Sequence, residues 1–238
     1  TNMSEYYNKS LTGDKTINSI AINGSDAYLS TGFGIVRIDV RNAAISDTYN
    51  LGVNVYATAP DGNRIFAATS DGMYRATADD NLADRSKWTR YSRKTFGSLF
   101  VFDGELIGLN SGEACVMDRT ADKYRVFYTP WFRRVKVSGG KMLCYGGSHT
   151  YIISATDRRQ DVAFSWGGIE YSPADDSYWI AGSDGKLAKG VIGGDGSVQT
   201  TLAGVAPDGP EYNFFGFMRF INGQLYTCGG RGNPERDA

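Results

Sequence analysis

The sequence predicts an all-β fold built from repeated antiparallel strands, and three observations support this. The stretch YLSTGFGIVRID, residues 28–39, alternates apolar and polar residues on both sides of a glycine turn, as a β-hairpin does. The stretch RIFAATSDGMYRA, residues 64–76, repeats this order: an apolar run, a Thr, a turn ending in Gly, and an apolar pair before a basic residue. No segment keeps the i, i+3, i+4, i+7 apolar spacing of an amphipathic helix.

The glycine turn recurs along the chain at intervals of 38, 40, 35, 38 and 45 residues. This period is close to the about 40 to 50 residues that form one blade of a β-propeller. The sequence therefore consists of copies of one structural unit. The turn glycines are Gly34, Gly72, Gly112, Gly147, Gly185 and Gly230.

Each copy contains four predicted strands in a fixed order. An apolar strand and a turn with Asn, Asp or Gly precede a more apolar second strand, and the glycine turn, a third strand and a weaker fourth strand follow. The strands of the first two copies are predicted at 18–22, 27–31, 34–40 and 45–51, then at 55–59, 64–69, 72–76 and 87–93. Those of the next three are at 98–102, 105–109, 113–119 and 124–130, at 134–138, 141–145, 150–155 and 161–166, and at 169–173, 177–181, 185–192 and 198–204. The sixth copy has strands at 216–220 and 224–228.

Four antiparallel strands per repeat predict a β-propeller, because an isolated blade leaves two apolar faces in water whereas radially packed blades cover one another. We expect one propeller over residues 1–238, with five full blades and a partial sixth. A helical turn is predicted only in an insertion at 77–88. We interpret the chain as a fragment of a larger propeller; alternatively, a strand from residues 1–16 completes a thin sixth blade. The predicted blades are 17–53, 54–94, 95–130, 131–167, 168–210 and the incomplete 211–238.

Composition and charge limit the partners. The 238 residues include 25 Lys and Arg against 26 Asp and Glu, so the net charge is −1 and no overall field attracts nucleic acid. No apolar run approaches the about 20 residues of a membrane helix, so no direct membrane insertion is expected in this segment. Cys115, Cys144 and Cys228 are odd in number and form no C-x-x-C pair, so at least one is unpaired, and their apolar neighbours predict buried thiols.

Residues for catalysis or metal binding are sparse. The only histidine, His149, is expected at the surface in a turn, and Glu170 is a lone carboxylate on a predicted inner strand, whereas a glycosidase needs a pair. The group Asp79, Asp80, Asn81 and Asp84 lacks the spacing of a calcium loop and predicts a solvated capping turn. We therefore expect no catalysis, cofactor or metal, with a propeller glycan-processing enzyme as a weaker alternative.

Aromatic residues recur in the predicted connections from a fourth strand to the next first strand. In a propeller these connections lie on one rim around the channel, where aromatic rings beside arginines suit sugars, peptides or acidic groups. Alternatively, the rings fill the seams between blades. The candidate binding residues are Phe96, Trp131, Phe132, Arg133, Arg134, Trp166, Phe214 and Phe215.

Several short motifs carry a resemblance to a known family. They are YLSTGFGI followed by ID, SDTYNLG, the AAT-x-DG turn of the next copy, and APDGP near residue 208. With them the chain resembles the N-terminal β-propeller of PorZ-type proteins of Bacteroidetes, most densely over 17–88. It resembles more loosely the two-component-regulator propeller repeats of periplasmic sensors, of which YWIAGSDG at 178–185 is the nearest match.

The resemblance implies a location and a role. PorZ-type proteins belong to the type IX secretion system, so it implies an exported protein of the periplasm or outer cell surface. The implied role is a noncatalytic scaffold that binds envelope proteins or surface polysaccharide and continues into further blades or domains of its own polypeptide. The alternative is the ligand-sensing propeller of a hybrid two-component histidine kinase.

Overall fold

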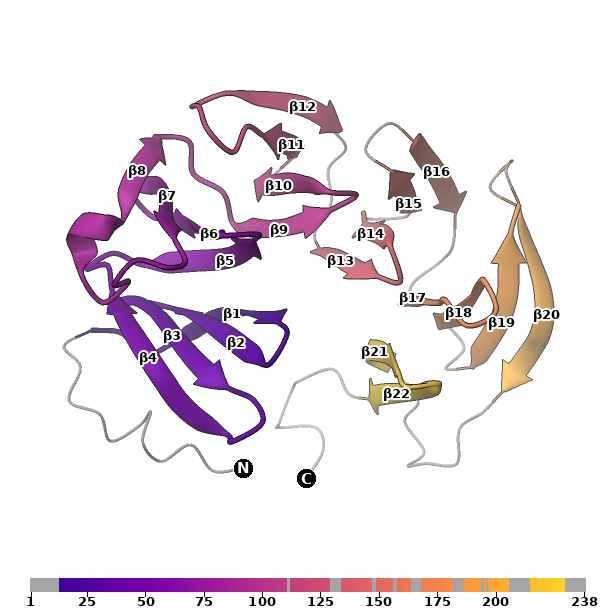
Figure 1. Cartoon of the computed structure of the whole chain (residues 1–238). Helices are drawn as coiled ribbons and strands as arrows, with labels where there is room; N and C mark the ends of the chain where they lie inside the picture. Colours follow the sequence, from indigo (N-terminus) through magenta and orange to yellow (C-terminus); the bar gives the residue numbers. More distant parts are fainter. Residues whose placement is uncertain are drawn as a thin grey trace. The chain divides into compact units, whose positions relative to one another are not determined.

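The computed structural model is all-β and divides into two compact units, residues 1–130 and 131–238. It describes residues 13–110, 112–128, 134–146, 149–155, 158–163, 168–181, 186–193, 195, 197–205 and 215–229. In this part of the chain the strands form five four-stranded antiparallel sheets and one two-stranded sheet (Figure 1). The prediction of four-stranded antiparallel blades is confirmed, and we number the sheets as blades 1 to 6.

The first unit contains three blades, and the strands of each pair in sequence order. Blade 1 is β1 (Ile17–Asn23), β2 (Asp26–Thr31), β3 (Gly34–Asp39) and β4 (Ala44–Asn50). Blade 2 is β5 (Val55–Asp61), β6 (Arg64–Thr69), β7 (Gly72–Thr77) and β8 (Thr89–Ser92), with the 3₁₀ turn η1 (Arg85–Lys87) before β8. Blade 3 is β9 (Ser98–Phe102), β10 (Glu105–Asn110), β11 (Glu113–Met117) and β12 (Tyr124–Tyr128).

The second unit contains the other three sheets. Blade 4 is β13 (Arg134–Ser138), β14 (Lys141–Tyr145), β15 (His149–Ala155) and β16 (Arg158–Ala163). Blade 5 is β17 (Ile169–Ser172), β18 (Ser177–Ala181), β19 (Leu187–Ile192) and β20 (Val198–Val205). The two-stranded blade 6 is β21 (Phe215–Ile221) and β22 (Gln224–Gly229).

The first strand of each blade lies on the inside of its unit. In the first unit β5 contacts both β1 and β9, and in the second unit β21 contacts β17. The fourth strands β4, β8 and β12 lie on the outside of the first unit (Figure 1). This order is the radial arrangement that the repeat predicts.

The Thr and Gly of the repeat have a shared structural role at the turn between the second and third strands. The Thr31 hydroxyl donates to the Gly34 carbonyl at 2.9 Å, and the Thr69 hydroxyl donates to the Gly72 carbonyl at 2.8 Å. A Cβ on residue 34 would lie 2.0 Å from the carbonyl oxygen of Tyr49 in the fourth strand. The Thr closes the turn, and the Gly lets the fourth strand approach.

Apolar side chains on facing sheets join neighbouring blades into cores. Between blades 1 and 2, Tyr28 and Ile35 pack in one cluster with Ile65. Because alternate residues of a strand face opposite sides, Phe66 instead packs toward blade 3, in a cluster with Leu106. In the second unit a cluster that includes Leu143, Ile152, Ile169 and Tyr178 joins blades 4 and 5 in the same way.

The insertion in blade 2 is ordered by its own side chains. Leu82 and Trp88 are buried in the cluster between blades 1 and 2, and the Trp88 indole N–H donates to the Leu82 carbonyl at 3.0 Å. The Asp84 carboxylate accepts from the Ser86 amide at 2.9 Å and caps η1. The helical turn predicted within residues 77–88 is therefore confirmed.

Cysteine and surface features agree with a packed β-protein. Cys115 and Cys144 are buried and free, as their apolar surroundings predict.

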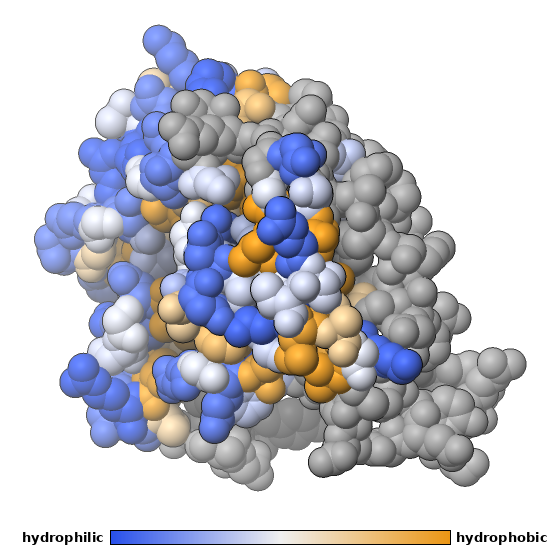
Figure 2. Space-filling view, turned by 90° about the vertical axis from the view of Figure 1, so that its right-hand side faces the viewer, coloured by the Kyte–Doolittle hydropathy of each residue, from blue (hydrophilic) through white to orange (hydrophobic). Residues whose placement is uncertain are grey.

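Val191, Val198 and Leu202 of blade 5 are exposed, and the view from the right-hand side of Figure 1 shows small apolar patches among hydrophilic residues (Figure 2). Among the described residues, no helix is both long and apolar enough to span a lipid bilayer.

Candidate binding surface

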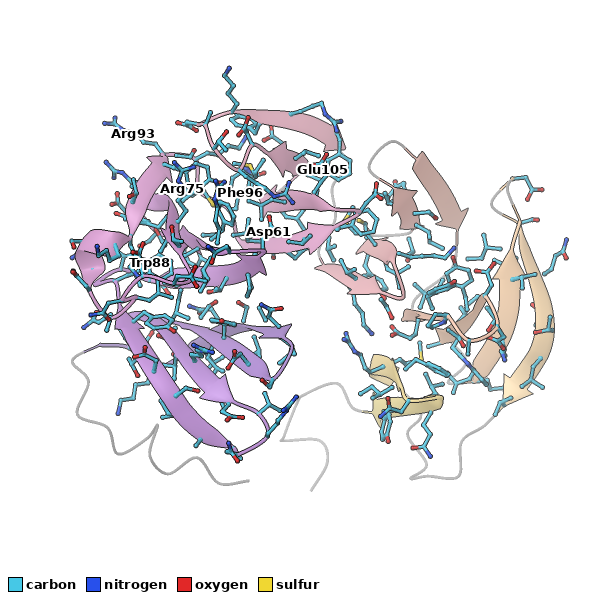
Figure 3. The ribbon with its side chains drawn as sticks, viewed as in Figure 1. Asp61, Arg75, Trp88, Arg93, Phe96 and Glu105 are labelled. Atoms are coloured by element: carbon cyan, nitrogen blue, oxygen red, sulfur yellow. The ribbon has the colours of Figure 1, made fainter. Side chains whose placement is uncertain are left out.

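Phe96, the described member of the predicted aromatic rim, lies in the core of the first unit. Its side chain is 1% exposed and packs in one cluster with Phe66 and Leu106, between blades 2 and 3 (Figure 3). Gly108 makes room for it, because a Cβ at that position would lie 2.8 Å from the Phe96 ring. At this position the aromatic residue fills the seam between two blades.

The other rim candidates fall outside the described side chains. Residue 134 is the first residue of β13, but its side chain is not among those described. The remaining candidates lie outside the described side chains as well: Trp131, Phe132, Arg133, Trp166, Phe214 and Phe215.

Glu170, the one carboxylate weighed as catalytic, is committed to a buried ionic network in the second unit. Its side chain is 0% exposed and pairs with the Lys136 ammonium. It also accepts from the Ser138 hydroxyl at 3.0 Å and from the Phe220 amide at 3.3 Å. Lys136 donates in addition to the Met218 carbonyl at 2.6 Å. The network links the first strands of blades 4, 5 and 6 and therefore has a structural role.

The acidic group of the insertion also has structural partners. Besides the Asp84 cap, the Asn81 side chain accepts from the Ala83 amide at 3.3 Å, and Asp79 accepts from the Asn63 amide group at 2.9 Å. Within the described residues, no three His, Cys, Asp or Glu side chains lie together as a group that could hold a metal ion.

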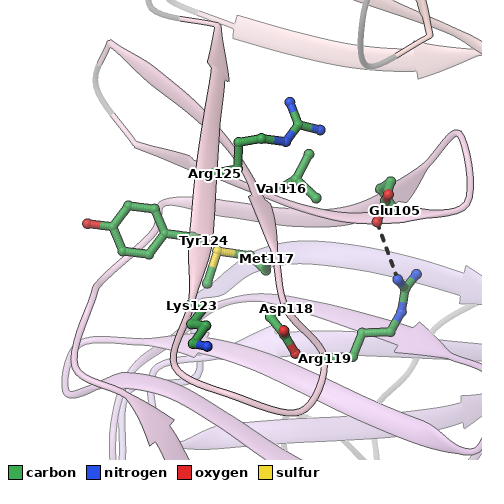
Figure 4. A pocket seen from close by; sticks show the side chains of 8 residues that line it. All are labelled: Glu105, Val116, Met117, Asp118, Arg119, Lys123, Tyr124 and Arg125. Atoms are coloured by element: carbon green, nitrogen blue, oxygen red, sulfur yellow. Dashed lines mark ion pairs between the residues drawn. The ribbon is translucent and has the colours of Figure 1, made fainter.

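Two hollows lie on one edge of blades 2 and 3, on either side of the β11–β12 turn. The larger one has a volume of about 490 Å³ (Figure 4). Its lining combines apolar and charged side chains: Glu105, Val116, Met117, Asp118, Arg119, Lys123, Tyr124 and Arg125. Four of these residues lie on β11 and β12, three lie in the turn between these strands, and Glu105 lies on β10.

Arg119 fixes the β11–β12 turn against blade 2. Its guanidinium pairs with Asp61 at the end of β5, lies 3.5 Å from the Glu105 carboxylate, and donates to the Gly104 carbonyl at 2.6 Å. Within the turn, the Asp118 carboxylate accepts from the amides of Thr120 at 2.7 Å and Ala121 at 3.0 Å. These hydrogen bonds hold the pKa of Asp118 at about 2.

The second hollow, which we call the two-arginine pocket, has a volume of about 300 Å³. The Arg64 guanidinium donates to the Arg119 carbonyl at 3.0 Å, and the Arg75 guanidinium donates to the same carbonyl at 2.8 Å and to the Thr120 carbonyl at 3.0 Å. Among the described residues, no carboxylate forms an ion pair with either guanidinium. The lining residues are Arg64, Arg75, Ala76, Thr77, Asp80, Lys87 and Thr89.

The Tyr91 ring packs against the Arg75 guanidinium. The Arg75 guanidinium carbon lies 5.4 Å from the centre of the Tyr91 ring, and Phe66 packs edge-on against the same ring at 5.8 Å. Burial raises the pKa of the Tyr91 hydroxyl to about 12. The hydroxyl is buried and has no hydrogen-bond partner among the described residues. Arg75 is thus held by carbonyls on one side and a ring on another.

Sequence reasoning did not single out these arginines, although one signal was present. The repeat places a basic residue in the third strand, Arg37 in blade 1 and Arg75 in blade 2. In blade 1 the Arg37 guanidinium pairs with Asp26 at 2.7 Å, whereas Arg75 pairs with main-chain carbonyls. The insertion distinguishes the two blades and could have drawn attention to blade 2.

The comparisons with known proteins agree with the resemblance found in the sequence. The family model described as the TSS9 PorZ N-terminal beta-propeller domain matches residues 1–89. PorZ of Porphyromonas gingivalis, described as an essential bacterial surface component of the type-IX secretion system, is 24% identical with a TM-score of 0.66 over 91% of this chain. The chain is a β-propeller. The predicted resemblance to PorZ is confirmed.

Other solved structures are similar in fold at lower identity. YCF48 bound to D1 peptide is 12% identical, with a TM-score of 0.62 over 92% of this chain and 78% of that one. The extracellular domain of BT4673 from B. thetaiotaomicron, described as a one-component or hybrid two-component system, is 11% identical, with a TM-score of 0.59 over 94% of this chain. No curated protein matches the sequence. The chain spans 30% of the PorZ structure and 33% of the BT4673 domain.

Proposed function

We propose that this propeller is a noncatalytic recognition module of a Bacteroidetes envelope protein that serves type IX secretion or surface attachment. It binds envelope proteins or surface polysaccharide and is exported to the periplasm or outer surface. The observation that carries the proposal is the match of residues 1–89 to the PorZ N-terminal propeller model, supported by the similarity to PorZ over 91% of the chain. The commitment of Glu170 to a structural ion pair supports a role without catalysis.

Deletion of the gene in its host tests this role. The expected result is that a tagged type IX cargo protein accumulates in the periplasm and loses its sensitivity to protease added to whole cells, and that the intact gene restores both. Unchanged attachment of the cargo at the surface overturns the proposal. Protease sensitivity of the propeller itself on whole cells tests its exported location separately.

The predicted aromatic rim is part of this proposal. We propose that Trp131, Phe132, Arg133, Arg134, Trp166, Phe214 and Phe215 contribute to the binding surface. Trp131→Ala is expected to weaken binding of the purified protein to envelope fractions by about tenfold, as loss of an aromatic anchor does. Tyr226→Ala, which removes an exposed ring from β22, is the matched control and is expected to bind normally. Undiminished binding by Trp131→Ala removes the rim from the proposal.

A second candidate function is ligand sensing in a two-component system. The similarity to the extracellular domain of BT4673 over 94% of this chain favours it. A sensor needs a membrane helix and a signalling domain in the same polypeptide, so the full-length gene product discriminates between the two functions. Ligand-dependent phosphorylation or transcription with unchanged cargo attachment would favour the sensor.

A further inference from the structure

The two-arginine pocket gathers hydrogen-bond donors from three adjacent strands onto one face of blade 2. Arg64 on β6 is opposite Thr77 on β7, and Arg75 on β7 is opposite Thr89 on β8. Residues opposite one another in an antiparallel pair project to the same side. Two guanidinium groups and two hydroxyl-bearing residues therefore line a single hollow.

Positive charge exceeds negative charge among the described residues that line this pocket. Arg64 and Arg75 both donate to the Arg119 carbonyl, so the two guanidinium groups lie close together although like charges repel. The main-chain carbonyls offset the repulsion between the two guanidinium groups only in part, because carbonyl oxygens carry partial charges. Lys87 adds a third cation to the lining, against one carboxylate, Asp80. This arrangement is complementary to an anionic group.

The insertion forms one part of the pocket wall, to which it contributes Asp80 and Lys87. In blade 1 the corresponding strands β3 and β4 are joined by residues 40–43 alone, whereas in blade 2 the connection runs from 78 to 88. Leu82 and Trp88 anchor the longer connection in the core. The wall is thus fixed before a ligand arrives, which lowers the entropy cost of binding.

We propose that the two-arginine pocket binds one carboxylate of an acidic side chain, Glu or Asp, presented by a partner protein. Asp80 in the lining and Asp118 in the β11–β12 turn repel ligands with several negative charges, so this part of the surface favours a ligand with a single negative charge. The larger hollow on the other side of this turn offers the partly exposed Val116 to an apolar side chain of the same segment. The inference rests on the proposed role as a binding module.

Nuclear magnetic resonance of the arginine Nε–H groups tests the pocket. The probes are the blocked dipeptide N-acetyl-glutamyl-leucine amide, its glutaminyl counterpart, and inorganic phosphate. The glutamyl probe is expected to shift the signals of Arg64 and Arg75 saturably, with a dissociation constant of roughly 1 mM for so small a ligand. Equal binding of the glutaminyl probe, or tighter binding of phosphate at the same signals, overturns the proposal.

Variants separate the pocket from general charge effects. Arg64→Gln is expected to weaken binding of the glutamyl probe about fivefold, because a charge-assisted hydrogen bond is lost. Arg90→Gln is the matched control: Arg90 also belongs to blade 2 but pairs with Asp71 at 2.7 Å, at the opposite end of β7. Unchanged binding by Arg64→Gln overturns the proposal.

Lys87→Gln is a second variant for the case in which Arg64→Gln does not fold, since Lys87 is exposed. It is expected to weaken binding about twofold, as a peripheral cation does, and unchanged binding counts against the proposal. Cargo attachment in cells tests the proposed general function of the module separately from dipeptide binding. Loss of attachment on gene deletion together with no dipeptide binding therefore refutes the carboxylate pocket alone.

Discussion

Removal of the Glu170 carboxylate should destabilise the second unit strongly. Glu170 is 0% exposed and the Lys136 side chain is 12% exposed, so Glu170→Met leaves an ammonium inside the protein without its carboxylate. Breaking a buried pair in this way costs about 3 to 5 kcal/mol of the free energy of unfolding. For a chain of this size, each kcal/mol lowers the melting temperature by about 2 to 4 °C.

The double variant Lys136→Met with Glu170→Met separates the cost of removing the carboxylate alone from the contribution of the ion pair to stability. Replacing both partners by apolar residues of similar volume is often close to neutral. The Ser138 hydroxyl and the Phe220 amide lose their acceptor, which adds about 1 to 3 kcal/mol. We therefore expect the double variant to be more stable than either single variant.

Urea denaturation followed by far-ultraviolet circular dichroism measures these differences, and the double-mutant cycle gives the coupling energy. Glu113→Gln is the matched control, since Glu113 pairs with Lys94 at 2.8 Å but is 42% exposed; it should cost far less stability than Glu170→Met. The reasoning is refuted if Glu170→Met costs as little as this control, or if the double variant costs the sum of the two single variants.

Three further predictions concern single positions. Gly72→Ala should cost several times as much stability as Gly62→Ala. A Cβ at residue 72 would lie 2.4 Å from the Ser92 carbonyl oxygen, whereas a Cβ at residue 62 would meet no atom within 4 Å. Equal urea midpoints for the two variants would contradict the close approach of Ser92 to residue 72. Asp118 has a pKa lowered from 3.8 to about 2, so its stabilising effect is present above pH 4 and is lost as the pH falls toward 2. Asp118→Asn should therefore show a smaller loss of stability over this range than the wild type, and identical acid unfolding curves would exclude the effect. Burial raises the pKa of the Cys144 thiol to about 12, so Cys144 of the native protein should not react with maleimide at pH 8 until urea unfolds the protein, and rapid labelling of native protein at Cys144 would disprove its burial.

The blade architecture could be predicted from sequence because it depends on local chemistry repeated along the chain. Each hairpin has its own signal, such as Thr31 and Gly34, which close a turn through a hydrogen bond inside it. The insertion was also recognisable, since it breaks the spacing between the third and fourth strands and contains the capping residue Asp84. Alternation of apolar residues then fixes which side chains face a neighbouring blade.

The candidate sites could not be predicted in the same way, because they depend on contacts between blades. Phe96 is in a connection, and its burial is decided by Gly108, a residue of another strand that leaves space for the ring. Glu170 has its counterion 34 residues away on blade 4. The Arg64 guanidinium donates to the Arg119 carbonyl, 55 residues later in the sequence. Such partners carry no periodic signal in the sequence.

The hydrogen bonds from Arg64 and Arg75 to the Arg119 carbonyl also bear on how the protein is made. Until blade 3 has docked on blade 2, both guanidinium groups remain hydrated. The carboxylate receptor that we assign to this face is complete only after residue 120 has been translated and the following hairpin has docked. The pocket therefore forms only when blades 2 and 3 are assembled, so binding of the carboxylate favours the docked pair of blades over a partly folded chain.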